Sequence, residues 1–261
     1  MNIKIKEKLE DFYDKEVWNH LSLGDFLTKV SNKYSEKIAI NENGNEYSYK
    51  EIESISNRYA KGFLKEGFKK GDKVVLQLPN SAELIFVAFA LFKIGVIPIM
   101  SLPAHRKTEI SGIIQLSEAK AYIAQDRYLG FSYTEMIREV IKENRTDIKV
   151  FIQGDNEEFR SLTEIKANTP IEENVNVDYK DIGLLLLSGG TTGIPKLIPR
   201  RHCDYLYVAE YSGRRCGLTE ESVYLAALPM SHNFPLGCPG IMGTLFYGCL
   251  LYTSDAADER S

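Results

Sequence analysis

Residues 187–200 read LSGGTTGIPKLIPR, and this stretch decides both the fold and the chemistry to expect. The apolar run 182–187 in front of it is typical of a buried strand, and Leu197 and Ile198 begin a second apolar run behind it. Glycine lets a backbone turn tightly and approach a ligand closely, so consecutive N–H groups can point at phosphate oxygens. The stretch therefore predicts a strand, a polyphosphate-binding loop and a second strand.

Polar groups in the loop favour phosphate binding over an ordinary surface loop. A Gly/Ser/Thr-rich segment on its own is most often a solvated loop, and most lysines are solvated as well. Here two apolar runs flank the segment, and Pro195 stiffens the backbone just before the positive charge of Lys196. The candidate ATP- and phosphate-binding residues are Ser188, Gly189, Gly190, Thr191, Thr192, Gly193 and Lys196.

The loop does not match the ordinary P-loop pattern, Gly-x-x-x-x-Gly-Lys-Ser/Thr. Ile194, not a lysine, follows Gly193. Leu197 follows Lys196 where that pattern requires a magnesium-binding hydroxyl. The loop is therefore not an ordinary P-loop.

Helix and strand patterns alternate along the chain. Ser48 and Glu51 form a capping-box pattern ahead of apolar residues at helical spacing, and Gly67 marks a stop. A second cap over 80–83 precedes a helix over 84–94 that is apolar on most sides and therefore buried. Such alternation predicts an α/β fold with mostly parallel strands, whose ligands lie at the carboxyl ends of the strands. Further helices are expected over 133–143 and 205–216, and strands over 73–78, 96–100, 121–124, 149–153, 182–187 and 224–228.

The loop resembles the signature of the adenylate-forming, AMP-binding ligase superfamily, a Ser/Thr/Gly-rich stretch that ends in Gly-x-Pro-Lys. Residues 228–240, LPMSHNFPLGCPG, resemble the substrate-pocket motif of the aryl-acid AMP ligases that feed siderophore assembly. The segments QLPN at 77–80 and SLPAHR at 101–106, with Glu109, follow the same family's pattern in order. The resemblance covers most of residues 12–248.

This resemblance implies an incomplete N-terminal adenylation domain with mostly parallel sheets flanked by helices. Its first subdomain would cover about 1–175, and its second would start at 176 and reach 248 with the phosphate loop. The family's C-terminal catalytic parts would lie beyond residue 248, so the chain is expected to be inactive alone. Arg201 stands where the aryl ligases usually have threonine, which leaves the local detail of nucleotide entry open.

The resemblance also implies a reaction, in which a carboxylate and ATP give acyl-AMP and pyrophosphate, with Mg²⁺ as cofactor. The loop residues and Lys196 would stabilise charge on the departing pyrophosphate, and Thr192 would lie near the magnesium ion. The product would pass to the phosphopantetheine thiol of an aryl carrier protein, or to CoA. Two other hypotheses stay open, an acyl- or aryl-CoA ligase and a non-catalytic nucleotide-binding fragment.

Residues 232–238 form the second candidate site. A lone histidine is usually an ordinary hydrogen-bonded or surface residue, and a lone phenylalanine is usually core. By resemblance, His232 lies beside the reacting carboxylate and acts in catalysis with Lys196, Asn233 bonds the hydroxyl ortho to that carboxylate, and Phe234 walls the ring. Cys238 favours salicylate over 2,3-dihydroxybenzoate, because a thiol is a weak hydrogen-bonding partner for a 3-hydroxyl.

Composition excludes some other classes of function. The net charge of -4, without a basic run, gives no electrostatic case for nucleic acid or for a membrane surface. The apolar run 84–92 is too short to span a bilayer, and the N-terminus is too charged for a signal peptide. Four cysteines at irregular spacing indicate reduced thiols. We therefore expect a cytoplasmic protein with neither membrane nor nucleic-acid partner.

Residues 249–261, CLLYTSDAADERS, resemble the translation of a sequencing-library adapter. A polar tail at a natural terminus is the alternative interpretation. The expectation is that the biological sequence stops at Gly248, and that 249–261 does not belong to it.

Overall fold

The computed structural model describes residues 18–171, 175–188 and 195–253. In these ranges seven strands form the larger sheet, in the order β11-β10-β4-β3-β5-β8-β9. Every neighbouring pair is parallel except β10 and β11, which are antiparallel at one edge. The predicted α/β class with mostly parallel strands is confirmed. The strands are β3 (Lys73–Gln77), β4 (Ile97–Met100), β5 (Ala121–Gln125), β8 (Lys149–Gln153), β9 (Arg160–Ser161), β10 (Ile182–Leu187) and β11 (Leu197–Arg201).

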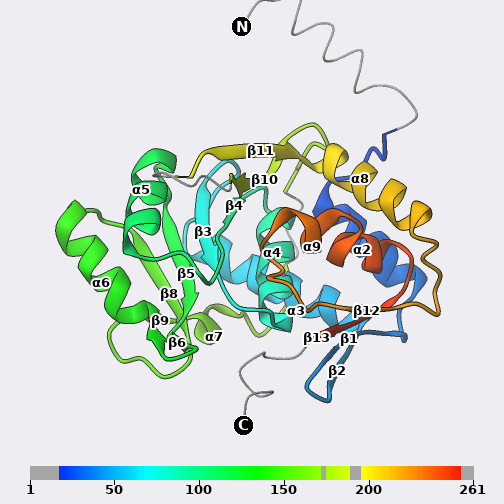
Figure 1. Ribbon diagram of the computed structural model, residues 1–261, viewed down its shortest axis with the longest axis horizontal. Coiled ribbons are helices and arrows are strands. Elements are labelled where there is room, and N and C mark those ends of the chain that lie inside the picture. The colour runs from blue at the N-terminus through cyan, green and yellow to red at the C-terminus, as the bar shows by residue number, and fades with distance from the viewer. Residues whose placement is uncertain (1–17, 172–174, 189–194, 254–261) are drawn as a thin grey trace, which may run out of the picture.

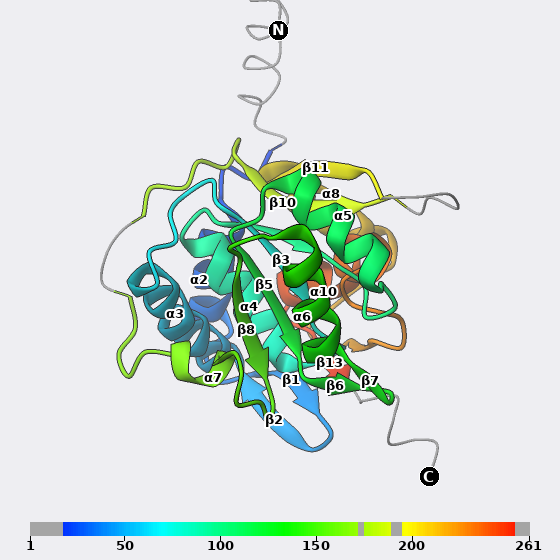
Figure 2. The ribbon, with the colours of Figure 1, turned by 90° about the vertical axis from the view of Figure 1, so that its left-hand side faces the viewer.

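Helices cover both faces of this sheet, as Figure 2 shows. Successive strand residues point to opposite faces, so Val74 and Leu76 join one buried cluster while Val75 joins another. The first cluster includes residues of α2 (Leu23–Lys33), α3 (Tyr49–Lys65) and α4 (Ala82–Lys93). The second includes residues of α5 (Lys107–Ser117) and α6 (Tyr133–Asn144). Because both faces are covered, the strands are apolar almost throughout.

A smaller sheet has the order β12-β13-β1-β2 and lies beside the helices of the first cluster (Figure 1). Its strands are β1 (Ile38–Glu42), β2 (Asn45–Ser48), β12 (Val223–Leu225) and β13 (Leu250–Thr253). Parallel pairing places β13 between β1 and β12, so residues 250–253 of the segment assigned to an adapter form a strand. Residues 254–261 lie outside the described part, and the origin of the segment stays a prediction.

The sequence patterns located most elements to within a few residues. Ser48 caps α3 with the predicted reciprocal bonds to Glu51, and Ser81 caps α4, whose residues 84–92 are all buried. Helix α8 (His202–Arg215) begins earlier than expected, and β12 is shorter than the predicted strand over 224–228. Both β10 and β4 belong to one sheet although the predicted subdomain boundary near 175 separates them, and that boundary stays a prediction.

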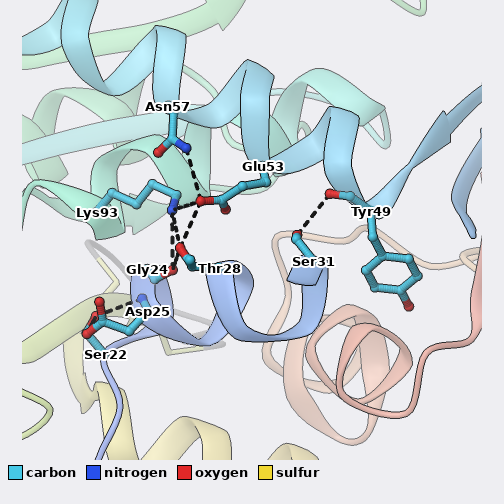
Figure 3. Close-up of polar contacts among 9 residues, drawn as sticks. All are labelled: Ser22, Gly24, Asp25, Thr28, Ser31, Tyr49, Glu53, Asn57 and Lys93. Carbon is cyan, nitrogen blue, oxygen red and sulfur yellow. Dashed lines mark hydrogen bonds and ion pairs between the residues drawn. The ribbon is translucent and has the colours of Figure 1, made fainter. Parts of the chain in front are cut away.

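An ion pair with little exposure joins the three helices of the first cluster (Figure 3). Lys93 Nζ on α4 lies 2.8 Å from Glu53 Oε1 on α3 and donates to Thr28 Oγ1 on α2 at 2.9 Å. Asn57 donates to the same carboxylate oxygen at 3.0 Å. Burial of charge is tolerated here because hydrogen bonds surround the pair.

The remaining elements are short. They include α10 (Gly240–Phe246), which packs against α8, and α9 (Asn233–Gly237) next to it. The other short elements are β6 (Arg127–Tyr128), β7 (Phe131–Ser132) and α7 (Leu162–Ile165).

No helix in the described ranges has the length and apolar character that a membrane span requires.

Candidate active site

The β10–β11 hairpin holds the two ends of the predicted phosphate loop. Ser188 N donates to Lys196 O at 3.0 Å, and Lys196 N donates to Ser188 Oγ at 3.0 Å. The Lys196 side chain is exposed. The hairpin thus brings Ser188 and Lys196 together at the carboxyl end of β10, where the sequence placed the site. Gly189, Gly190, Thr191, Thr192 and Gly193 lie outside the described residues, and with them the predicted magnesium contact.

Asn80 fixes the segment that leads from β12 to the second motif. Its Nδ2 donates to Ala226 O at 2.9 Å and to Leu228 O at 3.0 Å. Its Oδ1 accepts from Met230 N at 2.7 Å. Asn80 follows β3 of the larger sheet and Ala226 follows β12 of the smaller one. One side chain therefore ties the two sheets together immediately before His232.

His232 caps the short helix α9, and the rest of the motif follows within that helix. The His232 Nδ1 accepts from Phe234 N at 3.4 Å. Asn233 Nδ2 points at Cys238 Sγ, 4.0 Å away, and burial raises the pKa of the Cys238 thiol. The Phe234 side chain is 57% exposed, so the described residues do not enclose the ring that was predicted to wall the substrate.

Tyr205 contacts the candidate site residue Asn233, and the sequence motifs missed it. Its ring is buried and its hydroxyl donates to Asn233 O at 3.3 Å and Oδ1 at 3.4 Å. A Cβ at Gly237 would lie 2.7 Å from Tyr205 Cζ, so only glycine fits against this ring. Burial raises the pKa of the phenol and keeps it a neutral donor. Donation to Oδ1 leaves the Asn233 Nδ2 group free to donate elsewhere.

A pocket of about 100 Å³ brings three of the predicted site residues together, Ser188, His232 and Asn233. Lys196, Phe234 and Cys238 are not among the described residues that line it. The other lining residues are Met100, Leu102, His105, Leu186, Leu187 and Ser231. His105 and Ser231 were within the quoted motifs but carried no predicted role.

A larger, mainly apolar pocket of about 390 Å³ lies next to the Asn80 contacts. Asn80, Arg106 and Tyr133 line it together with residues 225–227. Neither His232 nor Asn233 is among the described residues that form it. The smaller pocket, where the polar side chains converge, is therefore the candidate site.

The departure from the aryl-ligase pattern at Arg201 lies at the start of α8. The Arg201 guanidinium donates to Lys180 O, ahead of β10. Next to it, His202 is buried, and its Nδ1 accepts from Leu23 N at 3.1 Å. Burial lowers the pKa of His202 to about 4, so this imidazole is neutral. This segment joins α8 to α2 and is separate from the pocket-lining residues.

The chain is similar to known proteins in sequence and in fold. A family model described as AMP-binding enzyme matches residues 27–261. The chain is 41% identical over 243 residues to the 2,3-dihydroxybenzoate-AMP ligase of Bacillus subtilis (strain 168), covering 93% of this chain and 45% of that protein. It is 35% identical over 251 residues to the salicyl-AMP ligase / salicyl-S-ArCP synthetase of Mycobacterium tuberculosis, covering 94% and 44%.

Among solved structures, the apo structure of Mycobacterium smegmatis MbtA superposes with a TM-score of 0.87 at 35% identity, covering 95% of this chain and 46% of that one. The chain belongs to the AMP-binding enzyme family, which is the superfamily of adenylate-forming ligases. It resembles the aryl-acid AMP ligases among them, as the motif at 228–240 predicted. The chain spans a little under half the length of these relatives.

Proposed function

We propose that this chain is part of an aryl-acid AMP ligase that uses ATP to adenylate a 2-hydroxybenzoate-type acid. The products are aryl-AMP and pyrophosphate, and the aryl group then passes to the thiol of an aryl carrier protein in siderophore biosynthesis. The observation that carries the proposal is the single pocket at the carboxyl ends of β4 and β10 that Ser188, His232 and Asn233 line. The names of the relatives support the acid and the acceptor.

The pocket residues distinguish a 2-hydroxylated acid from other acids. Asn233, held by Tyr205, offers its amide N–H to the ring hydroxyl, and His232 lies beside the carboxylate. An acid without the hydroxyl leaves the amide unpaired, which costs about 1–3 kcal/mol of binding. The site therefore selects for the hydroxyl ortho to the carboxylate.

The loop between Ser188 and Lys196 is proposed to bind the phosphates of ATP, with Mg²⁺ near Thr192. ATP supplies the AMP group and the pyrophosphate leaving group. Ser188 and Lys196 are positioned by the hairpin and orient the phosphates, and Lys196 offsets negative charge on the pyrophosphate. Glycine N–H groups and the threonine hydroxyls complete the loop in this proposal.

Cys238 is proposed to make salicylate the preferred acid, with 2,3-dihydroxybenzoate next. The thiol is half-buried beside Asn233 and burial keeps it protonated, so it presents a small and weakly polar surface. A serine there would offer a stronger partner to a 3-hydroxyl group.

The cellular location of the enzyme is proposed to be the cytoplasm.

The test is ATP–pyrophosphate exchange by the full-length gene product with salicylate, 2,3-dihydroxybenzoate and benzoate. Exchange that depends on a 2-hydroxylated acid, with no CoA thioester formed, is the expected result. Turnover of CoA would instead identify an aryl-CoA ligase. ATP binding without acid-dependent exchange would identify a non-catalytic nucleotide-binding protein.

The substrate assignment is tested by Cys238→Ser in the same protein. The ratio of kcat/KM for 2,3-dihydroxybenzoate to that for salicylate should rise. Cys216→Ser is the matched control, because Cys216 is exposed at the end of α8 and should leave the ratio unchanged. An unchanged ratio in the Cys238 variant would refute the preference for salicylate.

A further inference from the structure

Two buried polar side chains, Gln77 and Tyr122, fix the loop that follows β4 through hydrogen bonds. Tyr122 OH on β5 donates to Gln77 Oε1 at 2.6 Å. Gln77 Nε2 on β3 then donates to Leu102 O at 2.8 Å and to His105 O at 3.0 Å. Both Tyr122 and Gln77 are almost fully buried. His105 therefore has a fixed backbone position at the wall of the 100 Å³ pocket.

Contacts within the loop also fix which nitrogen of His105 carries the proton. Leu102 N lies 3.1 Å from His105 Nδ1 and can only donate, so Nδ1 is an acceptor. Ser101 Oγ lies 2.9 Å from the same nitrogen. Burial lowers the pKa of His105, which keeps the ring neutral. A neutral ring with Nδ1 as acceptor carries its hydrogen on Nε2, and the hydrogen bonds of the ring to described residues are both made by Nδ1.

Ser231 provides a second polar group in the same wall. The residue is 2% exposed, lines the pocket, and precedes His232 directly. Its Oγ is buried and has no hydrogen-bond partner within the part of the chain that the structure describes. Buried hydroxyls are nearly always paired, so an unpaired one on a residue that lines a pocket is a candidate partner for a ligand atom.

We propose that His105 Nε2–H and Ser231 O–H bind the carboxylate of the aryl acid whose ring hydroxyl Asn233 binds. The assignment rests on the proposed function. Both groups are donors, and a carboxylate is an acceptor only. They come from two different sheets, since His105 follows β4 and Ser231 follows β12, so the carboxylate is bound where the two sheets meet.

A variant can separate this role from a structural one. In His105→Asn the shorter side chain keeps an oxygen that can accept the Leu102 N–H, but it has no donor at the position of Nε2. Ser231→Ala removes only the unpaired hydroxyl. His20→Asn is the matched control, because His20 is exposed, packs on Tyr179 and is remote from the pocket-lining set.

The experiment measures salicylate binding to the full-length gene product by the fluorescence of the ligand, and benzoate binding by displacement of salicylate. His105→Asn and Ser231→Ala should each weaken both acids by about tenfold, the loss expected for one hydrogen bond to a charged group. The control should bind as the unmodified protein does. Nitrogen-15 NMR of the unliganded protein should show His105 protonated at Nε2 alone.

The outcomes distinguish the two proposals. Salicylate binding that is equal in His105→Asn and in the unmodified protein would overturn the carboxylate assignment and leave the proposed function standing. Loss for salicylate with unchanged benzoate affinity would overturn it as well, since the two donors would then recognise the hydroxyl. If the unmodified full-length protein binds neither acid, the proposed function fails and this inference fails with it.

Discussion

Replacement of Lys93 by methionine should destabilise the fold far more than the same change at an exposed lysine. The Lys93 and Glu53 side chains are only 9% and 18% exposed, and their charged atoms lie 2.8 Å apart (Figure 3). Methionine keeps most of the apolar stem and removes the charge. The carboxylate of Glu53 would then stay buried without a cation, and its Oε2 already has no partner among the described residues.

The expected magnitude follows from this burial. Removal of one partner from a buried ion pair costs about 3–5 kcal/mol, because the other charge is left uncompensated. Thr28 and Asn57 still donate to Glu53 Oε1 in the variant, which favours the lower end, about 3 kcal/mol of unfolding free energy. Lys107→Met is the control. Lys107 also contacts two carboxylates, but its side chain is 38% exposed, so solvent screens both pairs and the expected loss of stability is much smaller.

Urea unfolding followed by far-ultraviolet circular dichroism measures both variants under one condition. A midpoint that moves with an unchanged slope would identify a pure stability effect. The double variant Lys93→Met/Glu53→Leu should recover much of the loss, since no buried charge remains. The reasoning is refuted if Lys93→Met loses no more stability than Lys107→Met, or if the double variant is worse than the single one.

Three further predictions concern other parts of the fold. Burial lowers the pKa of His202 from 6.5 to about 4, so the imidazole of the unfolded chain is protonated before that of the folded chain as the pH falls. The contribution of His202 to the unfolding free energy should be full above pH 6.5 and drop by about 3 kcal/mol towards pH 4. A pH series on His202→Gln should lack this loss. Asn80→Ala removes three hydrogen bonds and should lower the unfolding free energy by about 2–3 kcal/mol, and Asn80→Asp should lose at least as much in the same urea titration, because it turns a carboxylate oxygen towards the carbonyl oxygens of Ala226 and Leu228. Gly62→Ala would place a Cβ 1.9 Å from Ile165 O, so a loss of about 2 kcal/mol is expected by thermal unfolding, and a neutral result would contradict the close packing of α3 on α7.

Local patterns predicted the strands and helices because the sequence signal of each element lies within a few residues. The capping box at Ser48 and the apolar run of α4 are such signals, and both were confirmed. The two strands that flank the loop from Ser188 to Lys196 were predicted for the same reason, but their antiparallel pairing was not. The parallel order of the strands was not deducible residue by residue, since it depends on contacts far apart in the chain.

The site was only partly predictable for the same physical reason. His232 and Asn233 stand in a recognisable motif, whereas Tyr205 reaches Asn233 across 28 positions and has no motif of its own. The role of His105 depends on which of its nitrogens accepts the Leu102 N–H, and that is a property of geometry. The exposed ring of Phe234 likewise reflects which elements lie nearby, and no local pattern carries that information.

The β10–β11 hairpin fixes the two ends of the loop through the pairing of its strands. Paired backbone groups set the distance between Ser188 and Lys196, eight positions apart, and Leu187 stays opposite Leu197. Segments of equal length from other members of the family can therefore be grafted between these two anchors without disturbing the sheet. A change of length is different, because a one-residue slip in β11 would turn every side chain of that strand to the opposite face. Strand pairing thus constrains the length of the segment, while the proposed binding of phosphates constrains its residues.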